Sequence, residues 1–229
     1  MQDFDRAIRS TLSDARFESY RREPTDAADD ILARYTWNMA LSEALYPILQ
    51  AIEIALRNRI NEAAAAEFDD PWWFDRAPPL DHRELAFVTA AKAELTKRGK
   101  PVEVGRLVAE LNFGFWTSLL DVRYERVLWP RLLRLAFPWM PRRQRTRHDL
   151  SRRFTTIRRL RNRVFHHEPI WHWHDLPRQH AALVEALGWM STELRDLIVS
   201  FDRFPSVYNA GVTDYRHQIH AFLTERQKL

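Results

Sequence analysis

Cysteine is absent from this chain of 229 residues, and glycine and lysine are scarce, with five and four residues. Without cysteine the chain can form no disulfide framework, no thiolate-bound zinc, no iron–sulfur cluster and no cysteine nucleophile. No glycine-rich phosphate loop occurs either, which argues against a small-molecule enzyme that uses a nucleotide.

Long apolar runs and a signal peptide are also missing. No run of about 18 apolar residues occurs, and the first residues, MQDFDR, are acidic and polar where a signal peptide would be apolar. We therefore expect a cytoplasmic protein with no membrane partner. The chain is nonetheless rich in core-forming residues, with 45% hydrophobic residues, nine Trp and 13 Phe. This composition predicts a folded protein.

The hydrophobic pattern is helical almost throughout. No stretch shows the alternation of β-branched and polar residues that a half-buried strand requires, so the sequence predicts an all-α fold. We expect helices over residues 5–20, 26–68, 142–166 and 177–201, with Pro47 kinking or dividing the second. Asp81 to Glu84 reads as a capping box for a helix that Gly99 closes. Residues 69–79 are predicted to be an aromatic loop that covers the core.

Positive charge is concentrated in one segment. Ten arginines lie between Arg142 and Arg163, where Asp149 is the only acid, although the net charge of the chain is only +4. The alternative interpretation is that the excess of arginine over lysine in the whole chain reflects genome composition, and that some of these arginines form a solvated helix face. For the block as a whole we favour contact with phosphate, and RNA is the expected partner.

The arginine-rich segment ends in the sequence LRNRVFHHEP, residues 160–169, which contains an R-N-x-x-x-H element. Arginine is always cationic and histidine changes charge near neutral pH, so the pair suits cleavage of a phosphodiester without a metal. Arg161 also falls on a core-facing row, where a cation is costly unless it meets an anion or an interface. The other members of this row are Leu150, Phe154, Ile157 and Val164.

Several alternatives exist for the histidines and tryptophans near this element. His166 could act only as a cation at a helix C-terminus. A metal site built from His166, His167, Glu168, His172 and His174 lacks paired helical spacing, so we expect no metal and no cofactor. The Trp171–His172–Trp173 cluster is more often a core or interface plug than a platform for unpaired bases, although stacking of bases on it remains open.

A second copy of the element lies earlier in the chain. Residues 56–60 read LRNRI and match residues 160–164 almost letter for letter, but the position five after Arg57 is Glu62 rather than histidine. This copy cannot perform the same acid–base chemistry. We interpret it as structural, with Glu53 and Arg57 at the spacing of a helical ion pair; it could instead face the same site from a neighbouring helix.

The chain resembles the Abi-like (abortive infection) branch of the HEPN superfamily. The resemblance covers residues 25–200 and is carried by three segments, EIALRNRI at 53–60, FGFWTSL at 113–119 and RNRVFHHEP at 161–169. It implies a HEPN-type helical bundle with additional helices, over residues 1–203. The sequence pattern itself predicts a loop and a short helix at 204–229. The resemblance also implies a two-fold homodimer in which two copies of the motif form one composite site.

In active relatives such a site cuts RNA without a metal, and the proteins serve as toxins or phage-defence effectors, with an antitoxin protein as a possible partner. The resemblance places the catalytic arginine at Arg161, the polar residue at Asn162 and the histidine at His166, with His167 as the alternative. The expected RNA-binding residues are Arg153, Arg158, Arg163 and His167.

The spacing itself supports a composite site. On an unbroken helix, positions 161 and 166 lie about 140° apart, so either the helix distorts before Pro169 or a second subunit completes the site. The competing function is a catalytically inactive protein that binds RNA or a partner protein through the arginine-rich helix.

Overall fold

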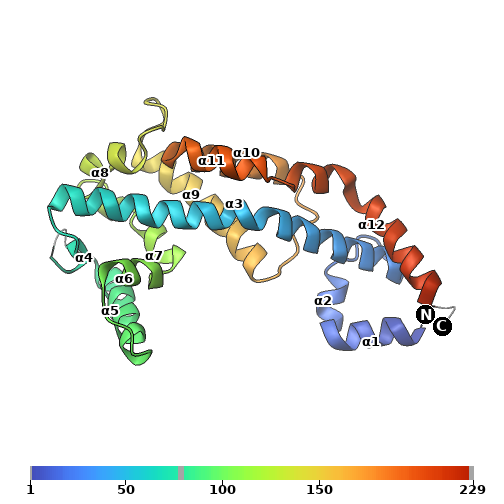
Figure 1. The fold of residues 1–229 in the computed structure, drawn as a ribbon. Coiled ribbons are helices and arrows are strands. Elements are labelled where there is room, and N and C mark those ends of the chain that lie inside the picture. The colour runs from blue at the N-terminus through green and yellow to red at the C-terminus, as the bar shows by residue number, and fades with distance from the viewer. Residues whose placement is uncertain (1, 77–79, 227–229) are drawn as a thin grey trace. The chain divides into compact units, whose positions relative to one another are not determined.

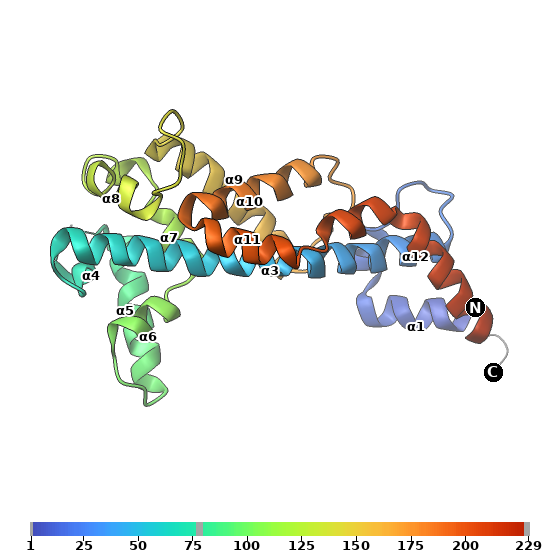
Figure 2. The ribbon, with the colours of Figure 1, turned by 45° about the horizontal axis from the view of Figure 1, so that its top comes forward.

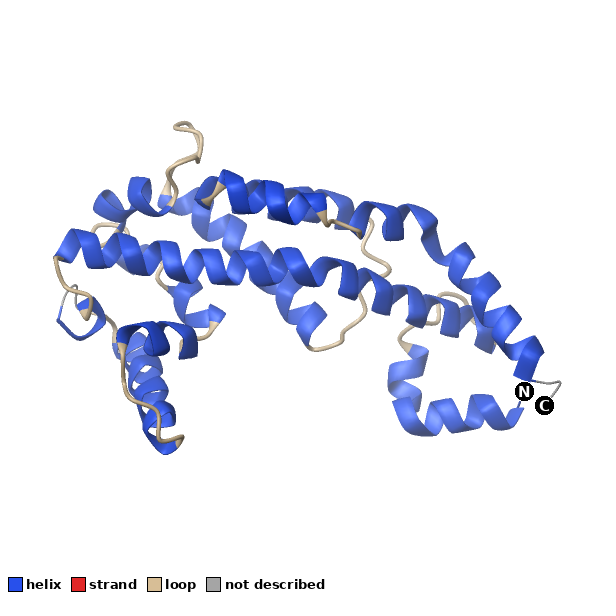
Figure 3. Cartoon of the chain, viewed as in Figure 1, coloured by secondary structure: helices blue, strands red, loops and turns tan. Residues whose placement is uncertain are grey.

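The structure is a computed structural model, and it describes residues 2–76 and 80–226. Every regular element in these ranges is a helix, so the predicted all-α fold is confirmed (Figures 1 and 3). The helices in chain order are α1 (Gln2–Leu12), α2 (Asp14–Glu18), α3 (Ala28–Phe68), α4 (Trp73–Arg76), α5 (His82–Lys97), α6 (Val104–Glu110), α7 (Phe113–Ser118), the 3-10 helix η1 (Val122–Tyr124), α8 (Trp129–Ala136), α9 (Arg147–Phe165), α10 (Leu176–Met190), α11 (Thr192–Ser200) and α12 (Phe204–Arg226).

The chain forms two compact units, each built from separated segments. The first contains Met1–Pro47, Arg161–His180 and Phe201–Leu229, and the second contains Ile48–Leu160 and Ala181–Ser200. The C-terminal segment belongs to the same compact unit as the N-terminal one. The motif that begins at Arg161 therefore belongs to the first unit.

Helix α3 runs through Pro47 without being divided. Proline removes one backbone donor from the helix, but neighbouring side chains such as Leu45, Ile48 and Leu49 are buried, and their burial offsets the lost bond. By length and composition α3 is also apolar enough to cross a membrane, and half of its most apolar stretch is buried inside the protein. Core helices of soluble proteins meet the same criterion.

The N-terminal and C-terminal helices pack together in the first unit. Phe4 of α1 contacts Phe222 of α12 with ring centroids 5.7 Å apart, and the guanidinium of Arg226 lies 5.1 Å from the Phe4 ring. The start of α1 and the end of α12 lie side by side (Figure 2). Next to them, Phe17 and Tyr20 are buried against Ile31 of α3. The C-terminal segment is thus helical from Phe204, with a break at Gly211, whose φ is +67°, rather than a loop followed by a short helix.

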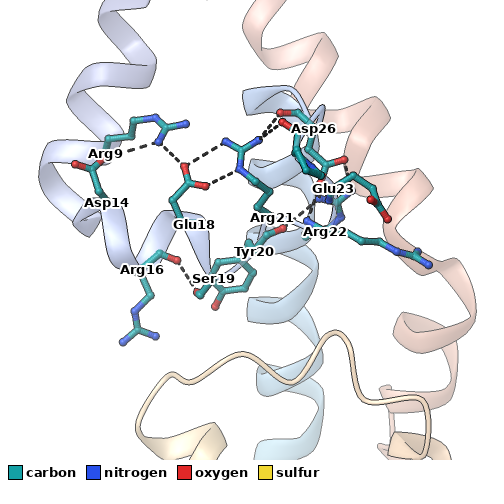
Figure 4. Close-up of polar contacts among 12 residues, drawn as sticks. Arg9, Asp14, Arg16, Glu18, Ser19, Tyr20, Arg21, Arg22, Glu23 and Asp26 are labelled. Atoms are coloured by element: carbon teal, nitrogen blue, oxygen red, sulfur yellow. Dashed lines mark hydrogen bonds and ion pairs between the residues drawn. The ribbon is translucent and has the colours of Figure 1, made fainter.

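The helix expected over residues 5–20 is two helices. Ser13 has a φ of +73°, and its hydroxyl accepts a hydrogen bond from the Arg16 N–H at 3.3 Å, so it is the N-cap of α2. Glu18 then joins the two helices to the following turn, since it accepts from Arg9 at 2.7 Å and from Arg21 at 2.5 Å (Figure 4). These hydrogen bonds, first from Arg21 and then from Arg9, lower the pKa of Glu18 to about 2.

Large aromatic side chains form the core of the second unit. Trp73, Trp116 and Trp129 are fully buried, and each indole N–H reaches an acceptor. The acceptors are the side-chain oxygen of Asn61 and the carbonyls of Leu111 and Leu119, at 3.1, 3.2 and 2.7 Å. Trp73 opens α4, a short helix within the predicted aromatic loop, while residues 77–79 of that loop lie outside the described residues. Burial of satisfied indoles contributes much of the stability of this unit.

The α5 capping box contains a tyrosine that the sequence did not predict. Asp81 is the N-cap, but its backbone N–H donates to the Tyr124 hydroxyl at 3.0 Å, and this hydroxyl donates to the buried Glu84 carboxylate at 2.8 Å. The Tyr124 hydroxyl therefore bridges the backbone N–H of Asp81 and the carboxylate of Glu84, and it connects α5 to η1. At its other end α5 closes at Gly99, with a φ of +64°, as predicted.

We expect Tyr124→Phe to lower the free energy of unfolding by about 1–3 kcal/mol, because it leaves the Glu84 carboxylate buried without this donor. Burial is the largest cause that raises the pKa of Tyr124 to about 12, from an ordinary value of 10.0. The folded state thus holds this proton more tightly, so the contribution of Tyr124 is complete below pH 10 and is lost between about pH 10 and 12. Urea denaturation of both proteins at pH 7 and pH 11 measures the effect, and an equal gap at both pH values would contradict it.

Candidate functional site

The motif lies where α9 ends. His167 donates its backbone N–H to the carbonyl of Val164 at 3.1 Å, and Glu168 donates to Arg163 at 2.8 Å. Together with a φ of +57° at His167, these bonds form a Schellman turn with histidine in the position that glycine usually takes. Regular helix stops at Phe165, but His166 still donates its backbone N–H to the carbonyl of Asn162 at 2.9 Å, so the chain leaves the helix only at His167. The angle of about 140° between positions 161 and 166 therefore still applies.

We expect His167→Gly to be more stable than His167→Ala by about 1 kcal/mol, because glycine adopts a left-handed conformation without the steric cost that a Cβ brings. Both substitutions remove the imidazole, so the difference isolates the backbone. Urea denaturation at pH 7 measures it. If the alanine variant were the more stable of the two, His167 would not have a left-handed backbone conformation at the end of α9.

Arg161 lies on an aromatic surface. Its guanidinium carbon is 4.3 Å from the centroid of the Phe165 ring, and Nη1 donates to the side-chain oxygen of Asn162 at 3.4 Å. Phe165 in turn stacks on Tyr46 of α3, with centroids 5.4 Å apart and an interplanar angle of 23°. Arg161 is half-buried, whereas the adjacent Leu160 is fully buried. The predicted core-facing row therefore contains a half-buried Arg161 between the buried side chains of Ile157 and Val164.

Both candidate histidines are exposed. Side chains of α2 and α3 form hydrogen bonds to the backbone of the turn that carries them. A guanidinium nitrogen of Arg16 donates to the carbonyl of His167. The buried side chain of Asn38 accepts from the N–H groups of Ile170 and Trp171 at 2.7 and 3.1 Å. An arginine at the C-terminal end of a helix satisfies a carbonyl and complements the helix dipole. These contacts hold the backbone from His167 to Trp171 in one conformation.

Two cavities adjoin the turn within the first unit. One, of about 480 Å³, is lined by Phe165 together with residues of α3 and Phe201. The other, of about 470 Å³, is lined by Arg16, Tyr20 and further α3 residues. His167 and Ser42 line both cavities. Of the two histidines, His167 is therefore the one that lines cavities in which a ligand could bind.

The predicted RNA-binding arginines differ in their surroundings. Arg153 belongs to the second unit and is held there by Glu185 at 2.7 Å, by the carbonyl of Ala182 at 2.9 Å and by the ring of Trp189. Arg158, in the same unit, is half-buried and forms no ion pair with an acid in the described part of the chain. Arg153 thus has a clear structural role, and Arg158 is the more available of the two for phosphate.

Arg163 lies in the first unit, close to the loop after α9. It pairs with Glu168 at 3.3 Å, donates to the carbonyl of Pro169 at 3.3 Å, and lies 5.3 Å from the centroid of Trp173. It therefore ties the end of α9 to the tryptophans that follow.

Other arginines of the basic segment also bind carbonyl groups. Arg145 donates to Pro138 and Met140, and Arg147 donates to Leu120 at 3.2 Å. Part of this charge is therefore structural. An arginine of the earlier LRNRI copy also has structural contacts. Arg59 donates to the carbonyl of Leu135 at 3.0 Å, and its guanidinium lies 3.5 Å from the carboxylate of Glu62.

Sequence reasoning missed Arg16 and Asn38, which position the motif turn. Each is more than 130 positions away along the chain from the backbone group that it binds, and neither belongs to a recognisable motif. Within residues 2–76 and 80–226, no group of three or more His, Asp or Glu side chains is arranged to hold a metal ion. Comparison with protein-family models, curated proteins and solved structures found no match to this chain.

Proposed function

We propose that the protein is a metal-independent endoribonuclease of a toxin–antitoxin or phage-defence system, with its site at the end of α9. The observation that carries the proposal is the Schellman turn at His167, which presents two exposed histidines within two turns of Arg161 and Asn162. The resemblance to Abi-like HEPN proteins supplies the reaction, and the turn supplies a reason why these residues are accessible.

The chemistry needs a base, an acid and a cation. A histidine removes the proton of the 2′-hydroxyl, and the 2′-oxygen attacks phosphorus as the bond to the 5′-oxygen breaks. A second histidine gives its proton to the leaving 5′-oxygen, which yields a 2′,3′-cyclic phosphate and a 5′-hydroxyl. Arg161 stabilises the negative charge on the non-bridging oxygens, and Asn162 orients the phosphate.

A second copy of the chain completes the site in this proposal. Three large apolar side chains near the motif are strongly exposed, Met39 at 54%, Tyr46 at 48% and Phe201 at 71%, and they line the two cavities that adjoin His167. An apolar surface of this kind beside polar groups is typical of a subunit interface. A symmetric contact here would bring two motifs together and provide the acid and the base from different subunits.

The test is an assay of the purified protein with single-stranded RNA in the presence of EDTA. We expect fragments that end in a 2′,3′-cyclic phosphate and begin with a 5′-hydroxyl. Mass spectrometry of the fragments identifies the ends. Fragments with a 5′-phosphate, or a requirement for added divalent metal, would contradict the mechanism.

A binding role without cleavage is the second candidate. It is favoured by the orientation of Arg161 in the single chain, where the guanidinium lies over Phe165 and bonds Asn162. In that case the protein holds RNA or a partner protein through the arginine-rich helix. RNA affinity in the EDTA assay without any fragments would support this function over the first.

A further inference from the structure

A third cavity in the first unit is lined mainly by aromatic rings. Its volume is about 380 Å³, within the usual range for small-ligand sites. The rings come from α3, from the loop after α9 and from α12. We call it the Trp171 cavity, and its lining residues are Arg22, Arg34, Trp37, Trp171, His172, Trp173, His174, Tyr208, Val212 and Arg216.

Trp171 has a buried hydrogen-bond donor without an acceptor. Its indole Nε1 is inaccessible to solvent and reaches no acceptor in the described part of the chain. Trp37, by contrast, donates its indole N–H to the carbonyl of Val207 at 3.1 Å. A buried donor left unpaired costs about 1–3 kcal/mol. Since Nε1 has no accessible surface, a ligand in the cavity cannot accept a hydrogen bond from it, and Trp171 offers the cavity the other atoms of its ring.

The charges around the cavity favour an anionic ligand. Arg34 is paired with Asp26 at 2.6 Å and Arg216 with Asp30 at 2.7 Å. Arg22 is exposed, forms no ion pair among the described residues, and points away from Asp26 (Figure 4). Aromatic rings alone also suit quaternary ammonium ligands, but an unpaired arginine opposes a cation. The combination fits a flat ring that carries a negative group.

We propose that the Trp171 cavity binds one unpaired nucleobase of a nucleotide, with the base stacked on the tryptophan rings and the phosphate at Arg22. The inference rests on the proposed function, because Arg163 of the motif lies against Trp173 and so connects the cavity to the end of α9. A base held there would align the single strand with Arg161. Partial burial, followed by the charge of Arg163, lowers the pKa of His172, so its neutral ring can both donate to and accept from a base.

Binding is tested without cleavage by using a short, fluorescently labelled 2′-O-methyl oligouridine, which has no nucleophilic 2′-hydroxyl. Anisotropy with the whole protein gives the affinity. We expect Trp173→Ala and Arg22→Ala each to weaken it about ten-fold. Trp171 packs against the buried core cluster of the unit, so Trp171→Phe, which keeps a smaller ring for stacking, is the safer change and should weaken affinity about five-fold. Trp139→Ala and Arg126→Ala, at exposed positions of the second unit, are the matched controls.

Affinities within two-fold of wild type for Trp173→Ala and Trp171→Phe would overturn the proposal. Competition by uridine monophosphate distinguishes the source of the base. If the monophosphate displaces the labelled oligonucleotide at a concentration similar to that of the unlabelled oligonucleotide, the natural ligand is a free nucleotide. If it competes only weakly, the natural ligand is RNA. The failure of this proposal can be distinguished from the failure of the proposed function. Cleavage in EDTA with no effect of the cavity variants would refute only the cavity, whereas cavity-dependent binding without cleavage would refute only the ribonuclease.

Discussion

Replacing Arg161 with alanine is expected to reduce the rate of RNA cleavage by about 10²–10³-fold, the usual effect of removing one group that stabilises charge in the transition state. The fold should survive, because Arg161 is only half-buried and its side chain lies over Phe165 at the edge of the core. Single-turnover cleavage of a labelled RNA in EDTA measures the rate. Thermal unfolding of the same sample shows that the protein is intact.

The control for Arg161 is Arg152, an exposed arginine on the same helix whose side chain is 76% accessible. Arg152→Ala removes the same charge and should change the rate less than two-fold. Equal losses in the two variants would mean that the segment acts through its total charge, as in the binding alternative. Cleavage that survives both Arg161→Ala and His166→Ala would refute the assignment of the site.

The histidines can be separated in the same assay. His166→Ala should lower the rate by about 10²–10⁴-fold if His166 is the acid or base. His167 is better replaced by glycine than by alanine, because glycine removes the imidazole and adopts the left-handed turn, where φ is +57°, without steric cost. A larger loss for His167→Gly than for His166→Ala would assign the catalytic role to His167, the histidine that lines both cavities.

Hybrid dimers of the wild type and an inactive variant test the composite site. Wild type and His166→Ala, unfolded together in equal amounts and refolded, should form hybrid dimers that lack either the acid or the base, so the mixture should be less active than its share of wild-type chains. Activity that follows the share of wild-type chains would mean that each site takes both histidines from one subunit. Light scattering should show a dimer, and substitution of Tyr46 by glutamate in the exposed apolar surface should yield inactive monomers. Active monomers would exclude the composite site.

Much of the fold could be predicted from local sequence signals. Helical periodicity and the lack of strand patterns gave the all-α class, and Asp81 and Gly99 marked the two ends of α5 because capping acts over a few residues. Two helix breaks were missed, at Ser13 and at Ser191. In both, the serine hydroxyl accepts from the N–H three residues later, at 3.3 and 3.1 Å. A serine followed by polar and acidic residues is a cap signal, so these breaks were open to prediction.

The candidate site could be predicted only in part. The motif residues are adjacent in sequence, and their chemistry is visible there. Arg16 and Asn38, which fix the turn, and Tyr124, which occupies the α5 capping box, act through contacts between distant segments. Such contacts depend on packing that no local pattern encodes. The same holds for the Trp171 cavity, because Trp37 and Trp171 are more than 130 residues apart and meet only in the folded chain.

The largest effect on stability is expected for Asp26, which forms a buried ion pair with Arg34. The two side chains are 10% and 8% accessible and make two parallel contacts, at 2.6 and 3.1 Å. Asp26 also accepts the backbone N–H groups of Arg22 and Glu23, at 2.7 and 2.9 Å. Asp26→Ala leaves a buried guanidinium and two N–H groups without their acceptor, so we expect unfolding to require about 3–5 kcal/mol less.

The pH dependence of this loss identifies its cause. Hydrogen bonds from Arg34, and then from the backbone of Glu23, hold the pKa of Asp26 well below the ordinary value of 3.8. A carboxylate with a lowered pKa stabilises the fold fully above that value, and the contribution is lost as the pH falls toward the folded pKa. The gap between wild type and Asp26→Ala in urea denaturation should therefore be constant from pH 5 to 7 and shrink below about pH 4. In the double variant Asp26→Leu with Arg34→Met, an apolar pair replaces the ions, and most of the stability should return. A gap that stays constant into acid, with no recovery in the double variant, would show that packing around Asp26, and not its charge, stabilises this part of the fold.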